Sequence, residues 1–176
     1  PLIEGVNLIG RAVSTTFGPN GKNVIIKNRG GIHITKDGAT VARYVNHENP
    51  IIEMGIEVVR QIATKTAKDV GDGTSTSVIL AQAIINELKD NNDHPIQIQR
   101  DLEEDTKKVI DYLESIKKEI ISYDDLVKVA TLSANNDESL GKLIAEAYQK
   151  VGKEGVVNFE ESNDITDSIV YTTGMQ

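Results

Sequence analysis

The sequence contains no cysteine, which excludes disulfides, thiolate metal sites and cysteine nucleophiles. The absence is also compatible with a reducing compartment. Only three histidines occur, and His33, His47 and His94 are too scattered to predict a zinc site. We interpret them as surface or hydrogen-bonded side chains. Acid–base chemistry in this chain would therefore depend on carboxylates.

Long apolar runs and an excess of positive charge are also missing. No stretch approaches the roughly 20 apolar residues that span a bilayer, so no membrane contact is expected. The net charge is -8 and no cluster of five or more Lys or Arg occurs, which argues against nucleic-acid binding. With 176 residues, 39% hydrophobic and 26% charged, the composition is that of a globular chain of one domain or one domain plus a lobe.

Hydrophobic periodicity predicts a mainly helical fold with small β elements, an α+β class. The expected helices cover residues 5–17, 39–45, 51–69, 75–89, 95–120, 122–132 and 136–151. The shorter helix from Ser122 carries a capping-box signature, S-Y-D-D. Short β-branched segments predict two hairpins, one pairing 23–27 with 33–35 and one pairing 156–160 with 168–171. An acidic loop joins the second pair.

The longest expected helix, 95–120, has a narrow apolar stripe whose members are four and three residues apart alternately. The stripe consists of Leu102, Thr106, Val109, Leu113, Ile116 and Ile120. We expect it to pack on a neighbouring element, with the charged face in solvent. After 152–155 the hydrophobic period changes to two, which marks a candidate boundary between a helical domain and a small lobe.

The segment 70–77, V-G-D-G-T-S-T-S, puts Asp72 between two glycines and four hydroxyl residues at the start of an expected helix. A helix start leaves about four N–H groups unpaired and carries about half a positive charge, so it attracts phosphate. A carboxylate there would repel bare phosphate, but it suits a Mg²⁺ ion bound between the two. The loop therefore indicates a metal–nucleotide site. The alternative, that Asp72 or Thr74 simply caps the helix, stays open.

Established phosphate-binding motifs do not match. If Gly21 and Lys22 were the Gly-Lys pair of a Walker A loop, the motif would begin at Thr16, where it requires Gly, and end at Asn23, where it requires Ser or Thr. A dinucleotide fingerprint beginning at 71–73 has Thr76 in place of its third glycine and follows a helix instead of a strand. A P-loop kinase and a Rossmann enzyme are therefore disfavoured.

Two further loops place polar groups at the ends of regular elements, 15–19 (T-T-F-G-P) and 35–38 (T-K-D-G). Asp37 is the best candidate for acid–base work, because Lys36 beside it could lower its pKa and keep it ionised. The alternative for this second loop is an ordinary hairpin turn.

Seven motifs occur in order along the chain: T-F-G-P-N-G-K-N-V, I-T-K-D-G-A-T-V-A-R, G-D-G-T-S-T-S-V-I-L-A-Q-A-I, T-L-S-A-N-N-D, G-K-L-I-A-E-A, V-G-K-E-G-V-V and G-M-Q. Together they resemble the group I chaperonin family, the Hsp60-type (60 kDa) folding machine. The resemblance runs from Gly5 to Gln176 and is weakest between Asn91 and Asp124.

The resemblance implies an equatorial ATP-binding domain, an intermediate hinge domain and an apical substrate-binding domain. Residues 1–132 would be the N-terminal half of the equatorial domain, and 133–176 the N-terminal half of the intermediate domain. The apical domain, the C-terminal halves and a second catalytic Asp would lie outside this chain. This boundary is earlier than the one at 152–155, because periodicity does not separate adjoining helical domains.

The resemblance also implies roles for single residues. Asp72 matches the Mg²⁺ ligand, Asp37 a carboxylate that positions the attacking water, and Lys36 a position at the nucleotide and potassium site. The other matches to nucleotide-contacting loops are Thr16, Phe17, Gly18, Pro19, Gly73, Thr74, Ser75 and Thr76. Ser75 replaces a usual Thr and keeps the hydroxyl. Ser133 lies near the nucleotide-facing part of the intermediate domain, with no strong direct role expected.

The sequence therefore leaves two candidate functions. The first is the ATP-binding and ATP-hydrolysing part of a chaperonin that assists the folding of unfolded proteins, with ATP and Mg²⁺, and K⁺ as a further cation. Its partners would be a homo-oligomeric ring, client proteins and a co-chaperonin. A bacterial-type cytoplasm is expected in preference to an organelle matrix. The second is a non-catalytic assembly piece with an incomplete site, favoured for the isolated chain, whose exposed apolar faces predict self-association. An unrelated helical enzyme would need a second catalytic constellation, and the sequence offers none.

Overall fold

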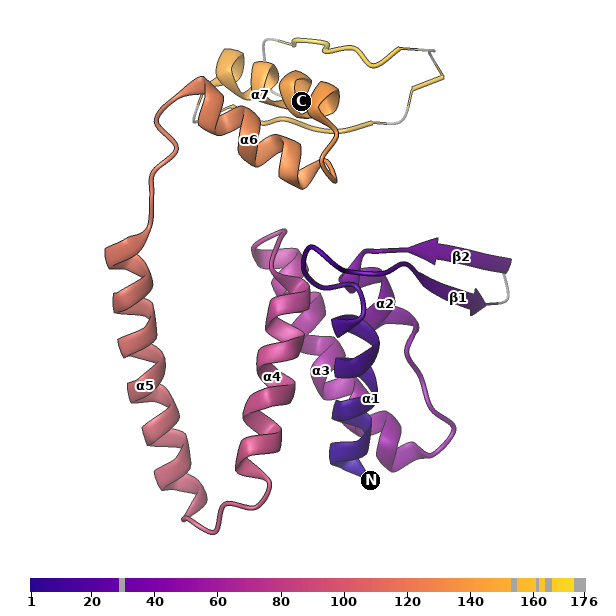
Figure 1. Ribbon diagram of the computed structural model, residues 1–176, viewed down its shortest axis with the longest axis vertical. Helices are drawn as coiled ribbons and strands as arrows, with labels where there is room; N and C mark the ends of the chain where they lie inside the picture. Colours follow the sequence, from indigo (N-terminus) through magenta and orange to yellow (C-terminus); the bar gives the residue numbers. More distant parts are fainter. Residues whose placement is uncertain (29–30, 153–154, 161, 164–165, 173–176) are drawn as a thin grey trace. The chain divides into compact units, whose positions relative to one another are not determined.

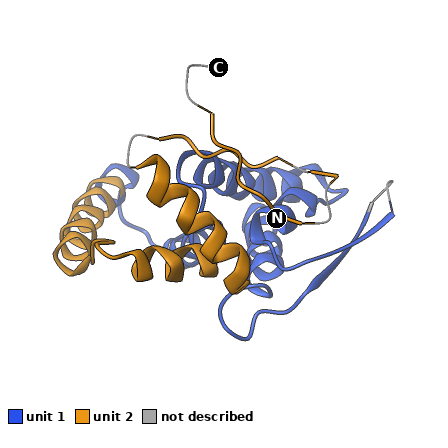
Figure 2. Ribbon diagram, turned by 90° about the horizontal axis from the view of Figure 1, so that it is seen from above, with its two compact units in different colours: residues 1–98 blue, residues 99–176 orange. Residues whose placement is uncertain are grey.

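The computed structural model describes residues 1–28, 31–152, 155–160, 162–163 and 166–172. The chain divides into two compact units, Pro1–Ile98 and Gln99–Gln176, which Figure 2 shows in different colours. In the part of the chain that is described, no helix is both long enough and apolar enough to cross a membrane.

The predicted class, mainly helical with small β elements, is confirmed (Figure 1). In chain order the elements are α1 (Leu2–Ser14), β1 (Val24–Asn28), β2 (Gly31–Thr35), α2 (Gly38–Tyr44), α3 (Pro50–Asp69), α4 (Thr74–Leu88), α5 (Pro95–Ile116), α6 (Tyr123–Ser133) and α7 (Glu138–Val151). Local signals set several of the helix ends. Asn49, for example, caps α3 by accepting the N–H groups of Ile51 and Ile52, and Pro50 occupies the first helical turn.

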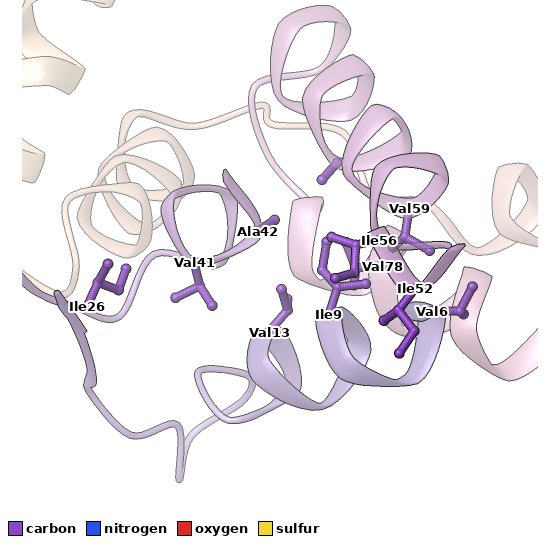
Figure 3. Packing of buried hydrophobic residues seen from close by; sticks show 11 residues of the cluster. Val6, Ile9, Val13, Ile26, Val41, Ala42, Ile52, Ile56, Val59 and Val78 are labelled. Carbon is purple, nitrogen blue, oxygen red and sulfur yellow. The ribbon is translucent and has the colours of Figure 1, made fainter. Parts of the chain in front are cut away.

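The core of the first unit lies between α1, α3 and α4, with α2 and β1 at its edge (Figure 3). Helical spacing puts Ile9 and Val13 on the inner face of α1, where both are fully buried. Ile56 of α3 and Val78 of α4 are equally buried in the same cluster. Burying each such side chain contributes about 1.5–3 kcal/mol, so this cluster is the main stabilising feature of the unit.

Two glycines let α1 and α3 approach unusually closely. A Cβ atom on Gly5 would lie 2.0 Å from the Ile52 carbonyl oxygen, and one on Gly55 would lie 2.1 Å from the Leu2 carbonyl oxygen. Both obstacles are backbone atoms of the opposite helix, which cannot rotate away. The crossing therefore requires glycine at both positions.

The predicted hairpin of 23–27 with 33–35 is confirmed as antiparallel β1 and β2, in which Ile25 faces Ile34 and Ile26 faces His33. One face of the hairpin packs inward, since Ile26 joins the core. On the same face His33 stacks on Tyr44 of α2, with ring centroids 6.4 Å apart. These two contacts attach the hairpin to the core and to α2.

In the second unit, α6 packs on α7. The predicted capping box is confirmed, because the Ser122 hydroxyl accepts the Asp125 N–H at 3.1 Å and donates to the Asp125 carboxylate at 2.7 Å. The following helix begins later than expected. Asn136 has φ 66°, outside the right-handed helical region, and Asp137 is the N-cap instead. Gly152 ends α7 with φ 73°, as predicted.

The expectations for α5 are wrong in two respects. The helix ends at Ile116 instead of 120, and none of its residues is buried. Leu102, Val109 and Leu113 are 38%, 57% and 54% exposed. Periodicity identifies an apolar face but does not supply its partner, and an unpacked last turn has little to stabilise it.

The second predicted hairpin is also wrong for the residues described. No strand occurs within the described parts of 155–160 and 166–172, and their joining loop lies partly outside the described residues. A pair of strands alone is marginally stable, so β-branched sequence produces extended backbone without a ladder. These segments instead line a cleft of about 270 Å³ beside α7, with Val157 and Ile169 partly buried.

Candidate functional site

The starts of α2 and α4 meet at one end of the first unit, beside the end of α1 (Figure 1). The contact is direct. A Cβ atom on Gly38 would lie 2.0 Å from Ser75 Oγ and 3.3 Å from Val13 Cγ1. Val13 is two residues before the loop at 15–19. The structure thus brings together the elements that carry all three loops singled out in the sequence.

The glycine-rich turn before α4 depends on left-handed backbone at two positions, since Gly71 has φ 84° and Gly73 φ 79°. Gly73 is the N-cap of α4, and no side chain caps the helix. The Asp72 carboxylate accepts the N–H of Gly73 at 2.6 Å and is exposed. The alternative in which Asp72 or Thr74 caps α4 is therefore wrong.

An uncapped helix start leaves the N–H groups of its first turn available. These belong to Thr74, Ser75 and Thr76, whose hydroxyls add further donors. Thr74 is buried, Ser75 is partly buried and Thr76 is exposed. The helix dipole adds partial positive charge at the same place, so this end of α4 has the chemistry of an anion site.

Asp37 caps α2 and makes no hairpin turn, so that alternative is wrong as well. Its carboxylate accepts the N–H of Ala39 at 3.3 Å and of Thr40 at 2.7 Å, and the Thr40 hydroxyl at 2.6 Å. Partial burial acts to raise the pKa of Asp37, but the Thr40 and Ala39 hydrogen bonds and the Arg43 charge outweigh it and lower the pKa. The expected influence of Lys36 on this pKa is not among the causes.

The loop that follows α1 is tightly closed. The N–H of Lys22 donates to the Thr15 carbonyl at 2.8 Å, and Thr16 is buried with its hydroxyl donating to the Val13 carbonyl at 2.8 Å. A Cβ atom on Gly21 would lie 2.2 Å from the Thr16 carbonyl oxygen. Phe17 is 49% exposed at the tip of this loop.

The remaining predicted positions are exposed or belong to the other unit. Gly18, with φ 77°, and Pro19 are exposed, as is Lys36 beside the Asp37 cap. Ser133, the last residue of α6, belongs to the other unit.

One polar cluster that holds α1 against α4 was not predicted from the sequence. The Gln82 amide donates to Asn7 Oδ1 at 3.0 Å, and the Asn86 amide donates to the same oxygen at 2.6 Å. Gly10 makes room for it, because a Cβ atom there would lie 2.2 Å from Gln82 Oε1. The only sequence signal was polar residues interrupting two otherwise apolar helix faces.

The polar groups at this end of the first unit can be compared with what a metal–nucleotide complex requires. Within the described ranges, no group of three or more His, Asp or Glu side chains could hold a metal ion. Mg²⁺ is usually bound by one or two carboxylates together with phosphate oxygens and water, and seldom by an all-protein cage. An exposed Asp72 beside an uncapped helix start fits that requirement, and the chain's own residues fit phosphate.

Comparison with known proteins gives one family. The model of the TCP-1/cpn60 chaperonin family matches residues 9–172. Two crystal structures of the chaperonin gp146 from bacteriophage EL 2 (Pseudomonas aeruginosa), both in the presence of ATP-BeFx, are similar to this chain. Crystal form I has 36% identity and a TM-score of 0.75 over 90% of this chain and 30% of the phage chain. Form II has 37% identity and a TM-score of 0.73 over 85% and 27%, so this chain spans less than a third of the phage protein.

Proposed function

The chain belongs to the TCP-1/cpn60 chaperonin family, and we propose that its first unit supplies one wall of the MgATP site of a protein-folding chaperonin. The supporting observation is the contact between Gly38 and Ser75, which puts the start of α2 against the uncapped start of α4. The assignment of group I type rests on the ordered motifs and on the similarity to the phage chaperonin.

The start of α4 would bind the phosphates. The first-turn N–H groups and the hydroxyls of Thr74, Ser75 and Thr76 supply donors, while the two glycines allow close approach. Asp72 would hold Mg²⁺ with one carboxylate oxygen while the other keeps the Gly73 N–H. When bound, ATP would supply the phosphoryl group, and Mg²⁺ would neutralise the negative charge that develops on it.

Asp37 would orient the attacking water. Like any ordinary Asp it is ionised at neutral pH, and its lowered pKa extends the ionised form further into the acid range, so it can accept a hydrogen bond from water. A carboxylate offers about four acceptor positions, and α2 uses three of them. The cap therefore fixes the carboxylate without saturating it.

The finer assignments belong to this proposal. Residues 1–132 would form half of an equatorial domain, and residues 133–176 half of an intermediate domain. Thr16–Pro19 and Lys36 would contact the nucleotide, and K⁺ would be a further cation at the site. A ring of identical subunits, unfolded client proteins, a co-chaperonin and a bacterial-type cytoplasm are proposed on the same basis. The two compact units divide elsewhere, between Ile98 and Gln99, within α5.

A second candidate is a non-catalytic assembly piece. The exposed apolar face of α5 favours this candidate. So does the candidate nucleotide site, because the residues described at it all belong to the first unit. In that case the isolated chain would bind MgATP weakly and would not turn it over.

Calorimetric titration with MgATP and a phosphate-release assay separate the two candidates. For the ATPase role we expect Asp72→Ala to weaken MgATP binding and Asp37→Ala to leave binding intact while slowing hydrolysis. Weak binding that Asp72→Ala abolishes, without turnover, supports the assembly piece with a partial site. Equal affinity and turnover in the wild type and both variants would remove the residue assignments.

A further inference from the structure

A chain of hydroxyl hydrogen bonds lies beneath the glycine-rich turn. The Thr66 hydroxyl on α3 donates to Ser77 Oγ on α4 at 3.1 Å. The Ser77 hydroxyl in turn donates to the Gly73 carbonyl at 3.1 Å. Thr66 and Ser77 are both partly buried, so these bonds are shielded from bulk water.

The backbone of the same residues completes a ring around the turn. The Thr66 carbonyl accepts the N–H groups of Val70 at 3.0 Å and Gly71 at 3.3 Å. At the other end, the Ser77 N–H donates to the Gly73 carbonyl at 2.9 Å. Thr66 and Ser77 thus hold Gly71 and Gly73, the two residues that flank Asp72.

We propose that Thr66 and Ser77 are positioning residues that hold the Gly71–Gly73 turn in the geometry needed to bind a magnesium-bound phosphate. This inference rests on the proposed nucleotide site and adds residues to it that do not touch the ligand. We call the chain from the Thr66 hydroxyl through Ser77 Oγ to the Gly73 carbonyl the hydroxyl clamp.

The physical need for such a clamp follows from the glycines. Gly71 and Gly73 have more backbone freedom than any other residue type, and Asp72 between them is exposed. An unrestrained turn would lose conformational entropy each time that it bound an anion. Restraint by neutral hydroxyls lowers that loss without adding a charge that competes with phosphate or metal.

The test uses Thr66→Val and Ser77→Ala, which remove the two hydroxyls with little change in volume. Thr64→Val is the matched control, because the Thr64 hydroxyl on the same helix donates only to its own helix, at the Arg60 carbonyl. Two quantities are measured: amide hydrogen exchange of residues 71–77, and the ratio of ADP affinities with and without Mg²⁺. A purely structural role would lower the melting temperature without changing that ratio.

We expect exchange at Gly71, Gly73 and Ser77 to accelerate about tenfold in Thr66→Val, which loses one bond of the clamp, and by more in Ser77→Ala, which loses both. The Mg²⁺-dependent gain in ADP affinity should fall about three- to tenfold, and the double variant should lose no more than Ser77→Ala alone, which already removes both bonds. Thr64→Val should match the wild type in both measurements.

Wild-type exchange rates in Thr66→Val and Ser77→Ala would overturn the clamp. So would faster exchange with an unchanged Mg²⁺-dependent gain, since the turn would then be held for another reason. If the wild type shows no nucleotide binding at all, the proposed function fails, and the exchange rates alone decide whether the clamp exists.

Discussion

Gly38 and Ser75 are in contact across the interface of α2 and α4, and a Cβ atom on Gly38 would come within 2.0 Å of Ser75 Oγ. Gly38 directly follows the Asp37 cap, and Ser75 lies in the uncapped first turn of α4. A missing side chain therefore determines how closely the proposed water-orienting carboxylate lies to the proposed phosphate-binding turn.

Gly38→Ala should separate these two helix starts. The added methyl group meets Ser75 Oγ and Val13 Cγ1, so we expect a loss of about 1–3 kcal/mol in the free energy of unfolding, as for an overpacked core. Urea unfolding followed by circular dichroism measures it. Adding Ser75→Ala should recover part of the loss, and a Gly38→Ala variant as stable as the wild type would show that the contact is looser than described.

The charge of Asp37 should make stability pH-dependent. Because its folded-state pKa is lowered, its contribution is present above the unfolded pKa of about 4 and is lost as the pH falls through the folded pKa. Asp37→Asn keeps the acceptor that caps α2 but should flatten this acid-side dependence, whereas Asp37→Ala should cost about 1 kcal/mol at pH 7. Unfolding curves recorded at pH values between about 2 and about 7, roughly one unit apart, measure this pH dependence. An unchanged acid slope in Asp37→Asn contradicts it.

Arg60 should stabilise the end of α2. Its guanidinium donates to the Ala42 and Val45 carbonyls and pairs with Glu53 and Glu57. Arg60→Met keeps the aliphatic stem but leaves these acceptors without their donor, so we expect a loss of about 1–3 kcal/mol in the free energy of unfolding.

The matched control for this change is Lys65→Met, on the exposed part of the same helix, which should cost under about 0.5 kcal/mol. Thermal unfolding monitored by circular dichroism compares the two. Equal melting temperatures for both variants would mean that Arg60 contributes no more than a surface charge.

The apolar face of α5 should drive self-association. Val109 and Leu113 are more than half exposed on this face, and no residue of α5 is buried. Val109→Glu should shift sedimentation-velocity profiles toward the monomer at concentrations where the wild type associates. Ser115→Glu, which adds the same charge on the opposite face, should not. Identical profiles for both variants would place the association elsewhere.

Much of the fold follows from local sequence. The period of 3.6 residues marks the core faces of α1 and α3, and Ser122 shows where α6 begins. What could not be predicted depends on distant partners. The close approach of Gly5 to Ile52 is one case, and the exposure of the α5 stripe, none of whose helical residues is buried, is another.

The candidate site divides in the same way. The residue types in 70–77 indicated phosphate and metal, because a helix start with glycines and hydroxyls has one simple chemistry. The capping hydrogen bonds that fix Asp37 come from Thr40, and the clamp on the turn comes from Thr66. Thr40 lies within the motif I-T-K-D-G-A-T-V-A-R, but its capping role depends on backbone geometry. Thr66 lies outside all seven motifs, and its role depends on contact between separate helices.

The most direct test of the proposed nucleotide site is a titration of the ¹⁵N-labelled chain with MgADP, followed by amide chemical shifts. This method detects weak binding and locates it. We predict saturable shifts confined to the three loops at 15–19, 35–38 and 70–77, and loss of their Mg²⁺ dependence in Asp72→Ala. Shifts elsewhere only, or shifts that Asp72→Ala leaves unchanged, would contradict the assignment of this end of the first unit as a MgATP site.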